Sequence, residues 1–213
     1  MQKDVIFKII LGIFTFIISP ITLWISILTS DESAVFASLS RMIWYTGSSL
    51  QIFLAMIVLF IPMLISFYYA CYIQNIKRYK KIICTVLLSV GTIILYIGAM
   101  WIMPGDGGTL TKENIWHGIL SFGGIFLIFL TLCLYAGFIY KIDKKSSCII
   151  GLFLIFLLIT ELFAVFNVSD ERSYVLASAI AEMYVLTMLS IISYLMLYFT
   201  SFKKGGNEDD NRN

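Results

Sequence analysis

The sequence predicts an all-α integral membrane protein, a bundle of six transmembrane helices. Of its 213 residues, 60% are hydrophobic and 13% are charged, whereas a typical soluble domain carries about 25% charged residues. The mean hydropathy is +0.92. A helix needs roughly 18–20 apolar residues to span a hydrocarbon core of about 30 Å. The segments that satisfy this length are approximately Val5–Thr29, Leu50–Ile73, Ile82–Met103, Ile115–Tyr140, Cys148–Val168 and Tyr174–Thr200.

The first apolar segment is expected to stay in the membrane as a spanning helix. It is too long for the apolar region of a signal peptide, and no small-residue cleavage site follows it. Later connections are short, at Gln74–Lys81, Lys141–Ser147 and Ser169–Ser173. Short connections place successive helices as antiparallel neighbours. The chain is therefore expected to form one domain, residues 1–204, followed by a polar cytoplasmic tail at 205–213 that is expected to be disordered.

Two connections on the predicted outer side are longer. Ser30–Ser49 contains the apolar and aromatic stretch Ala34–Tyr45, which is typical of an interfacial helix or of an extension of the second span. Pro104–Asn114 is glycine-rich and leads directly into the fourth span. Asn114 is expected to be the N-cap residue of that helix, because Asn is a preferred residue at this position.

The basic residues predict that both termini are cytoplasmic. With the N-terminus inside, twelve of the fifteen Lys and Arg residues lie on the inner side, and only Arg41, Lys112 and Arg172 lie outside. The net charge of +2 thus reflects topology and indicates no nucleic-acid partner. The expected location is the cytoplasmic (plasma) membrane, with the lipid bilayer as partner. The inner basic clusters lie where anionic lipid headgroups are found, although topology alone explains the bias.

Two glutamates inside apolar segments are the strongest functional signal in the chain. Glu161 lies in the fifth segment and Glu182 in the sixth. A carboxylate in hydrocarbon costs roughly 2.5–3.5 kcal/mol on insertion scales, and such a residue marks a functional site by default. Two nearby carboxylates repel each other when both are ionised. The pair is therefore expected to hold a proton, a cation or the amine of a ligand.

Other polar side chains are predicted at a similar depth. Thr22, Tyr96 and both glutamates lie about seven or eight residues from the outer ends of their helices, or roughly 10–12 Å at ~1.5 Å per residue. Ser121 lies about six residues in, and His117 and Asp106 are expected near the mouth. This layer predicts an acidic pocket that opens outward. The candidate ligand- or proton-binding residues are Glu161, Glu182, His117, Asp106, Tyr96 and Ser121.

Hydroxyl and small residues also recur at helical spacing, which predicts the faces that turn inward. Membrane helices use such residues for close approach and interhelical hydrogen bonds. Packing is therefore the favoured interpretation for most of the Ser and Thr positions. The main stripes are Thr15, Ser19, Thr22, Ser26 and Thr29; Thr85, Ser89, Thr92 and Tyr96; His117, Ser121, Gly124, Thr131 and Tyr135; and Ser178, Glu182 and Ser193.

The pocket favours binding, sensing or transport of a small cation or amphiphile, with no cofactor. Transporters often bind substrate between broken helices near the midplane. Here Pro20 and Pro62 are the only prolines within the predicted spans, and there is no internal repeat. These observations give little support to a transport function. A structural or accessory membrane subunit, in which the glutamates only stabilise helix contacts, is the alternative from another functional class.

An enzyme is the least favoured interpretation. His117 is the only histidine, whereas catalytic zinc usually takes three protein ligands rich in His or Cys. Ser121 follows His117 by four residues and shares its helix face, but this spacing also arises by chance in a serine-rich helix. An intramembrane lipid hydrolase is thus the weakest alternative. No catalytic and no metal-binding residue is assigned.

Three short motifs resemble a known family. They are Trp101–Asp106 (WIMPGD), Trp116–Gly118 (WHG) and Ala181–Tyr184 (AEMY). With six predicted spans, they make the chain similar to the uncharacterised prokaryotic membrane family catalogued as domain of unknown function 998. The resemblance implies a six-helix membrane fold and no settled activity, and Met183 departs from the Arg often found beside the helix-6 acid. The residues it singles out are Asp106, His117 and Glu182.

Overall fold

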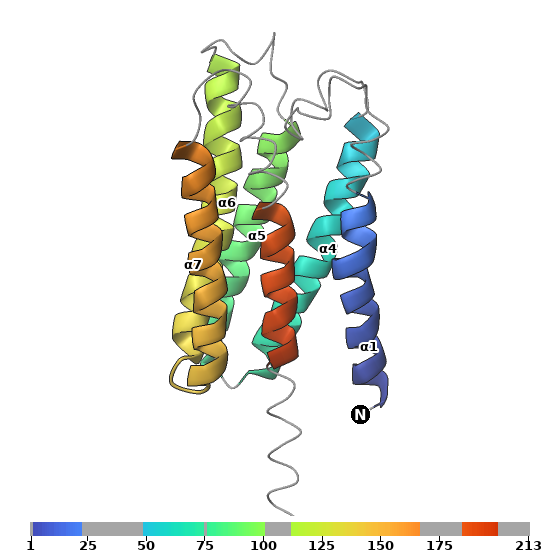
Figure 1. Cartoon of the computed structure of the whole chain (residues 1–213), viewed down its shortest axis with the longest axis vertical. Helices are drawn as coiled ribbons and strands as arrows, with labels where there is room; N and C mark the ends of the chain where they lie inside the picture. Colours follow the sequence, from blue (N-terminus) through green and yellow to red (C-terminus); the bar gives the residue numbers. More distant parts are fainter. Residues whose placement is uncertain (1, 23–48, 75, 101–111, 167–184, 200–213) are drawn as a thin grey trace, which may run out of the picture.

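The computed structural model describes residues 2–22, 49–74, 76–100, 112–166 and 185–199. Within these ranges all regular secondary structure is helical, and six helices lie side by side along the long axis of the molecule (Figure 1). This confirms the predicted all-α class. The helices are α1 (Gln2–Ile13) with its continuation η1 (Phe14–Ile18), α4 (Ser49–Ile73), α5 (Arg78–Met100), α6 (Lys112–Ile139), α7 (Lys144–Phe166) and the final helix Val185–Phe199.

Several of these helices are long and apolar enough to cross a membrane. Three candidate spans are Val5–Thr22, Arg78–Gly98 and Ile115–Ile139, and two shorter apolar helices are Phe60–Ile73 and Val185–Phe199. The outward faces are apolar as well, because large aliphatic side chains stay exposed along them. On α5 these side chains are Ile82, Val86, Val90, Ile93 and Ile97. The chain is an integral membrane protein with multiple spans.

Several helices begin earlier than hydropathy predicts, and the difference is largest for α5 and α7. α5 starts at Arg78 instead of Ile82, and α7 starts at Lys144 instead of Cys148. Hydropathy detects the part of a helix that lies in hydrocarbon, whereas Lys and Arg are good helix formers that extend a helix into the headgroup region. At the start of α7, Asp143 acts as the cap: its carboxylate oxygens accept hydrogen bonds from Ser146 N (3.2 Å) and Ser146 Oγ (2.9 Å).

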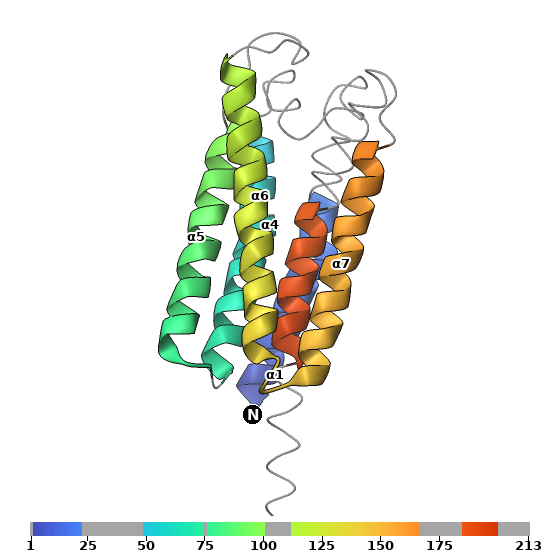
Figure 2. The same cartoon turned by 90° about the vertical axis from the view of Figure 1, so that its left-hand side faces the viewer.

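The expected cap of α6 is wrong. This helix begins at Lys112, so Asn114 lies within the first turn and is not its N-cap. The far end of α6 is joined to α7 by a tight turn in which the amides of Ile142 and Asp143 both donate to Ile139 O. The two helices separate towards their other ends (Figure 2).

α5 and α6 form the closest helix pair, because glycines let their backbones approach. A Cβ added at Gly124 of α6 would lie 2.5 Å from the backbone nitrogen of Leu95, and one at Gly98 of α5 would lie 2.7 Å from Ser121 N. Gly91 similarly faces Leu127, with 2.9 Å between the added Cβ and the Leu127 Cβ. The close contact between α5 and α6, called the seam below, therefore depends on glycines at these three positions.

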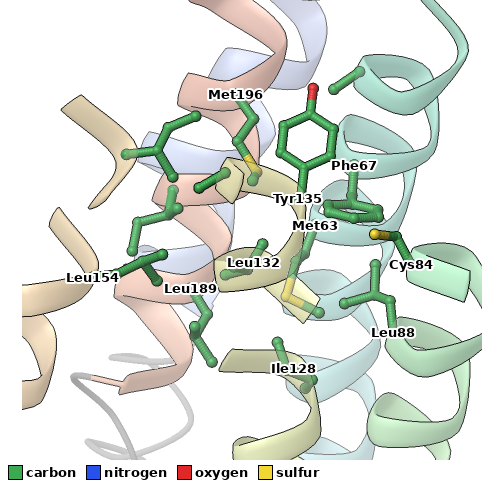
Figure 3. Close-up of a cluster of buried hydrophobic side chains, with 14 of the residues drawn as sticks. Met63, Phe67, Cys84, Leu88, Ile128, Leu132, Tyr135, Leu154, Leu189 and Met196 are labelled. Atoms are coloured by element: carbon green, nitrogen blue, oxygen red, sulfur yellow. The ribbon is translucent and has the colours of Figure 1, made fainter. Parts of the chain in front are cut away.

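The core lies where α4, α5, α6 and the final helix meet, and α7 adds Leu154 to it (Figure 3). Tyr135 of α6 is fully buried there, and its ring centroid lies 5.4 Å from that of Phe67 of α4. The Tyr68 hydroxyl of α4 is also hydrogen-bonded to the Ser89 hydroxyl of α5. The labelled members of the cluster are Met63, Phe67, Cys84, Leu88, Ile128, Leu132, Tyr135, Leu154, Leu189 and Met196.

α1 packs on the final helix around a single tyrosine. The Tyr194 hydroxyl donates to Lys8 O at 3.1 Å, and its ring meets Phe16 edge to face with centroids 5.3 Å apart. A Cβ at Gly12 would lie 2.7 Å from the Tyr194 hydroxyl oxygen. Of the predicted stripe of the first span, Thr15 and Ser19 are buried and Thr22 is half-buried, whereas Ser26 and Thr29 lie outside the described residues.

Where α1 and α4 cross, Ser19, the residue before Pro20, is hydrogen-bonded to the backbone carbonyl that Pro62 leaves without a helical donor. Proline has no N–H, so Pro62 leaves the carbonyl of Val58, four residues earlier, without its helical donor. Ser19 Oγ lies 2.9 Å from that carbonyl oxygen and 2.8 Å from Phe14 O. The π-helical turn η1 ends at Ile18, two residues before Pro20, and such local adjustments re-satisfy backbone groups that a proline frees. The Ser19 hydroxyl has one proton, and Phe14 O already accepts from the Ser19 backbone N–H, so the hydroxyl can donate to Val58 O in the neighbouring helix.

Candidate functional site

Four of the six predicted site residues lie on helices that the structure describes, and the other two lie outside the described residues. Tyr96 lies on α5, His117 and Ser121 lie on α6, and Glu161 lies in α7. Asp106 and Glu182 lie outside the described residues. The structure therefore brings His117, Ser121 and the α5 helix together, and the convergence of the acids stays a prediction.

His117 is held in the seam between α5 and α6. Its side chain is 9% exposed, and its Nδ1 lies 2.8 Å from the carbonyl oxygen of Gly98. A carbonyl oxygen only accepts hydrogen bonds, so Nδ1 is the donor and carries the proton. His117 lies five residues after the start of α6, and whether it borders a pocket stays a prediction. The contact fits an interhelical hydrogen-bond role.

Ser121 lies one turn along α6 from His117 and faces the same seam. Its backbone nitrogen is close to Gly98, and its Oγ is buried without a hydrogen-bond partner among the described residues. His117 and Ser121 therefore do not form the hydrogen-bonded pair that a serine nucleophile requires. Tyr96, on α5, is partly buried against the core cluster.

α7 has one buried stripe and one exposed face, which show which side of the helix is turned towards the other helices. Ile150, Leu154 and Leu157 are buried, with steps of four and three residues. The opposite face is exposed and apolar, as expected for contact with lipid chains, and its side chains include Leu152, Ile155, Phe156, Ile159 and Phe163. By helical spacing, position 161 is the next one on the buried stripe, four residues after Leu157.

Five described hydroxyls donate to the carbonyl four residues earlier in their own helix, a common bond for Ser and Thr in membrane helices. These bonds, at 2.7–2.9 Å, are made by Thr22, Thr92, Thr131, Thr160 and Ser193. Three buried residues have a hydroxyl without a hydrogen-bond partner among the described residues: Thr15, Ser66 and Ser190. Sequence reasoning overlooked Ser66 and Ser190. The available signal was spacing, since Ser66 lies one turn after Pro62 and Ser190 one turn after Leu186.

Within the described part of the chain, no group of three or more His, Cys, Asp or Glu residues is arranged to hold a metal ion. Comparison with known proteins provides no further lead, because no family model, curated protein or solved structure matches the chain. The resemblance to the six-helix prokaryotic family stays a prediction.

Proposed function

We propose that this protein binds a small cation or a cationic amphiphile at an acidic site formed by Glu161 and Glu182 in the outer half of a cytoplasmic membrane, for sensing or transport. Both termini are placed in the cytoplasm. The α4–α5 and α6–α7 turns, which lie at one end of the molecule (Figure 1), carry most of the described basic residues, whereas Lys112 lies at the other end of α6. This distribution supports that orientation under the positive-inside rule.

The observation that carries the proposal is the buried stripe on α7. Ile150, Leu154 and Leu157 pack inward, and Glu161 continues their spacing of three and four residues. In the sequence, Glu182 precedes Leu186 by four residues, and Leu186, Leu189 and Ser193 are buried in the final helix. The sequence spacing of both acids therefore matches that of the buried residues next to them.

Two carboxyl groups at one depth have a defined chemistry. In a medium of low dielectric, two ionised carboxylates repel, so the pair favours binding a proton or a positively charged group between them. A monovalent cation or an amine matches this pair best.

A structural or accessory role is the second candidate, and one observation favours it. His117, one of the predicted site residues, already bonds to Gly98 O, and it links α5 to α6 without any ligand. On this alternative the glutamates also serve only helix contacts. The protein would then show no cation-dependent change in stability.

The test is the thermal stability of the purified full chain in detergent, titrated with Na⁺, K⁺ and an alkylammonium ion. A ligand that binds only the folded state stabilises it by about 2.7 kcal/mol at 100 times its Kd. We expect one of these cations to raise the unfolding midpoint of the parent, and Glu161→Gln and Glu182→Gln each to remove this rise.

Asp4→Asn is the matched control, because it removes a carboxylate near the start of α1, at the opposite end of the molecule from residue 161. It should keep the full cation response. A parent that responds to none of the cations, or glutamine variants that respond as the parent does, would contradict the proposed site and favour the structural role.

A further inference from the structure

A basic rim surrounds one end of the molecule. It consists of the cations on the α4–α5 and α6–α7 turns: Lys77, Arg78, Lys80, Lys81, Lys141, Lys144 and Lys145. Both turns lie at the same end of the helix bundle (Figures 1 and 2). Five of the seven side chains are exposed, and Lys80 and Lys81 are half-buried. The rim therefore presents its positive charge at the surface.

Specific contacts hold parts of this rim in place. Lys80 Nζ lies 4.4 Å from the centroid of the Phe138 ring, which ties the first turn of α5 to the end of α6. Lys144 Nζ lies 5.8 Å from the ring centroid of Tyr140, and Lys81 Nζ donates to Tyr72 O at 3.2 Å. The two turns are thus joined into one surface instead of being two independent loops.

The rim has almost no counter-charge of its own. Asp143 is the one acidic residue within the two turns, and both its carboxylate oxygens accept hydrogen bonds from Ser146. Arg78 opens α5, which has no acidic residue in its first turn, whereas the N-terminus of α7 is capped by Asp143. Helix N-termini favour anions and disfavour cations. The start of α5 is therefore locally unfavourable unless an anion lies against it.

We propose that the basic rim binds the headgroup phosphates of anionic phospholipids in the adjoining leaflet. Exposed Tyr72, Tyr79 and Tyr140 border the rim, and tyrosine is enriched at the headgroup level of membrane proteins. One and two turns after Tyr79 along α5, the exposed side chains of Ile82 and Val86 continue the same helix face and offer an apolar surface to acyl chains. This combination of phosphate-binding cations, interfacial aromatics and an adjoining apolar face fits a lipid better than a soluble anion. The inference is independent of the glutamate site.

The test uses the full chain in a neutral detergent, titrated with phosphatidylglycerol or with phosphatidylcholine of the same acyl chains. We expect phosphatidylglycerol to raise the unfolding midpoint in a saturable manner and phosphatidylcholine to have little effect. Each Lys or Arg near an anionic surface contributes about 1 kcal/mol, so Lys77→Gln/Arg78→Gln, which removes two charges, should raise the lipid concentration for half the shift by about 30-fold. Lys144→Gln/Lys145→Gln, on the second turn, should have a similar effect.

Lys8→Gln/Lys112→Gln is the matched control, because it removes the same charge outside the rim. Its half-saturation concentration should stay within about twofold of the parent value, since the control removes no rim cation. Three outcomes would overturn the proposal. These are no selective response to phosphatidylglycerol, an equal loss in the control, and an equal stabilisation by inorganic phosphate, which would identify a soluble anion as the ligand.

Discussion

Gly124→Ala should lower the free energy of unfolding by about 1–3 kcal/mol, the usual range for overpacking a well-packed core. The added Cβ would lie 2.5 Å from both the backbone nitrogen and the Cβ of Leu95, and 2.6 Å from its Cα. Backbone atoms cannot move aside as the end of a flexible side chain can, so α5 and α6 must separate. The hydrogen bond between His117 Nδ1 and Gly98 O lies in the same seam and would be weakened with it.

The adjacent residue is a stringent control for this prediction. A Cβ at Gly123 would meet no atom within 4 Å, although Gly123 lies in the same helix and the substitution is the same. Because alanine is better than glycine in a helix by up to about 1 kcal/mol, Gly123→Ala should be neutral or slightly stabilising. Urea or thermal unfolding of both variants in one detergent measures the difference. Equal effects of the two substitutions would show that the seam is not as close as the structure has it.

Ser19→Ala should destabilise the protein by about 1–3 kcal/mol, the cost of leaving a buried acceptor without a donor. The carbonyl of Val58 has no helical donor because Pro62 lacks an N–H, and Ser19 Oγ lies 2.9 Å from it. Ser193→Ala is the control. Ser193 is equally buried, but it donates to Leu189 O within its own helix, so its removal orphans no group.

A double-mutant cycle with Pro62→Ala isolates this contact. Alanine at position 62 restores an N–H that can donate to Val58 O within α4, so the Ser19 hydroxyl is no longer needed there. The cost of Ser19→Ala should therefore fall by about 1 kcal/mol in the Pro62→Ala background, within the range measured for directly contacting residues. A cycle with no coupling energy would mean that Ser19 does not satisfy the proline-freed carbonyl.

Sequence alone was sufficient for the helices of the bundle, because each apolar segment is long enough to span and is bounded by polar turns. It was insufficient where a helix leaves the hydrocarbon, as at Arg78 and Lys144, because basic residues lower the hydropathy while still favouring a helix. The cap of α6 was wrong for the same reason, since α6 already begins at Lys112.

Contacts between helices required the structure. The stripe containing His117, Ser121 and Gly124 was recognised as an inward face, but its partner could not be read from one helix. Only the packing shows that the carbonyl oxygen of Gly98 accepts a hydrogen bond from His117. The Ser19–Val58 contact depends on which helices cross and at what height along them, and a hydropathy pattern predicts neither. For the candidate site, spacing relates Glu161 to a stripe that the structure shows to be buried.

The central claim is that Glu161 and Glu182 face each other, and cysteine cross-linking tests it most directly. The native thiols at positions 71, 84, 133 and 148 are free, so they are first replaced by alanine. Glu161→Cys/Glu182→Cys is then oxidised, and the remaining thiols are counted by maleimide labelling and intact mass. A disulfide requires Cα atoms about 4.4–6.8 Å apart, and short bifunctional maleimides extend this reach.

The control pair is Ile159→Cys/Glu182→Cys, because Ile159 lies on the exposed face of α7. We predict that the 161–182 pair loses both thiols on oxidation or accepts one short cross-linker, whereas the 159–182 pair keeps two labelled thiols. Two freely labelled cysteines at 161 and 182, or equal cross-linking of both pairs, would contradict a shared acidic site.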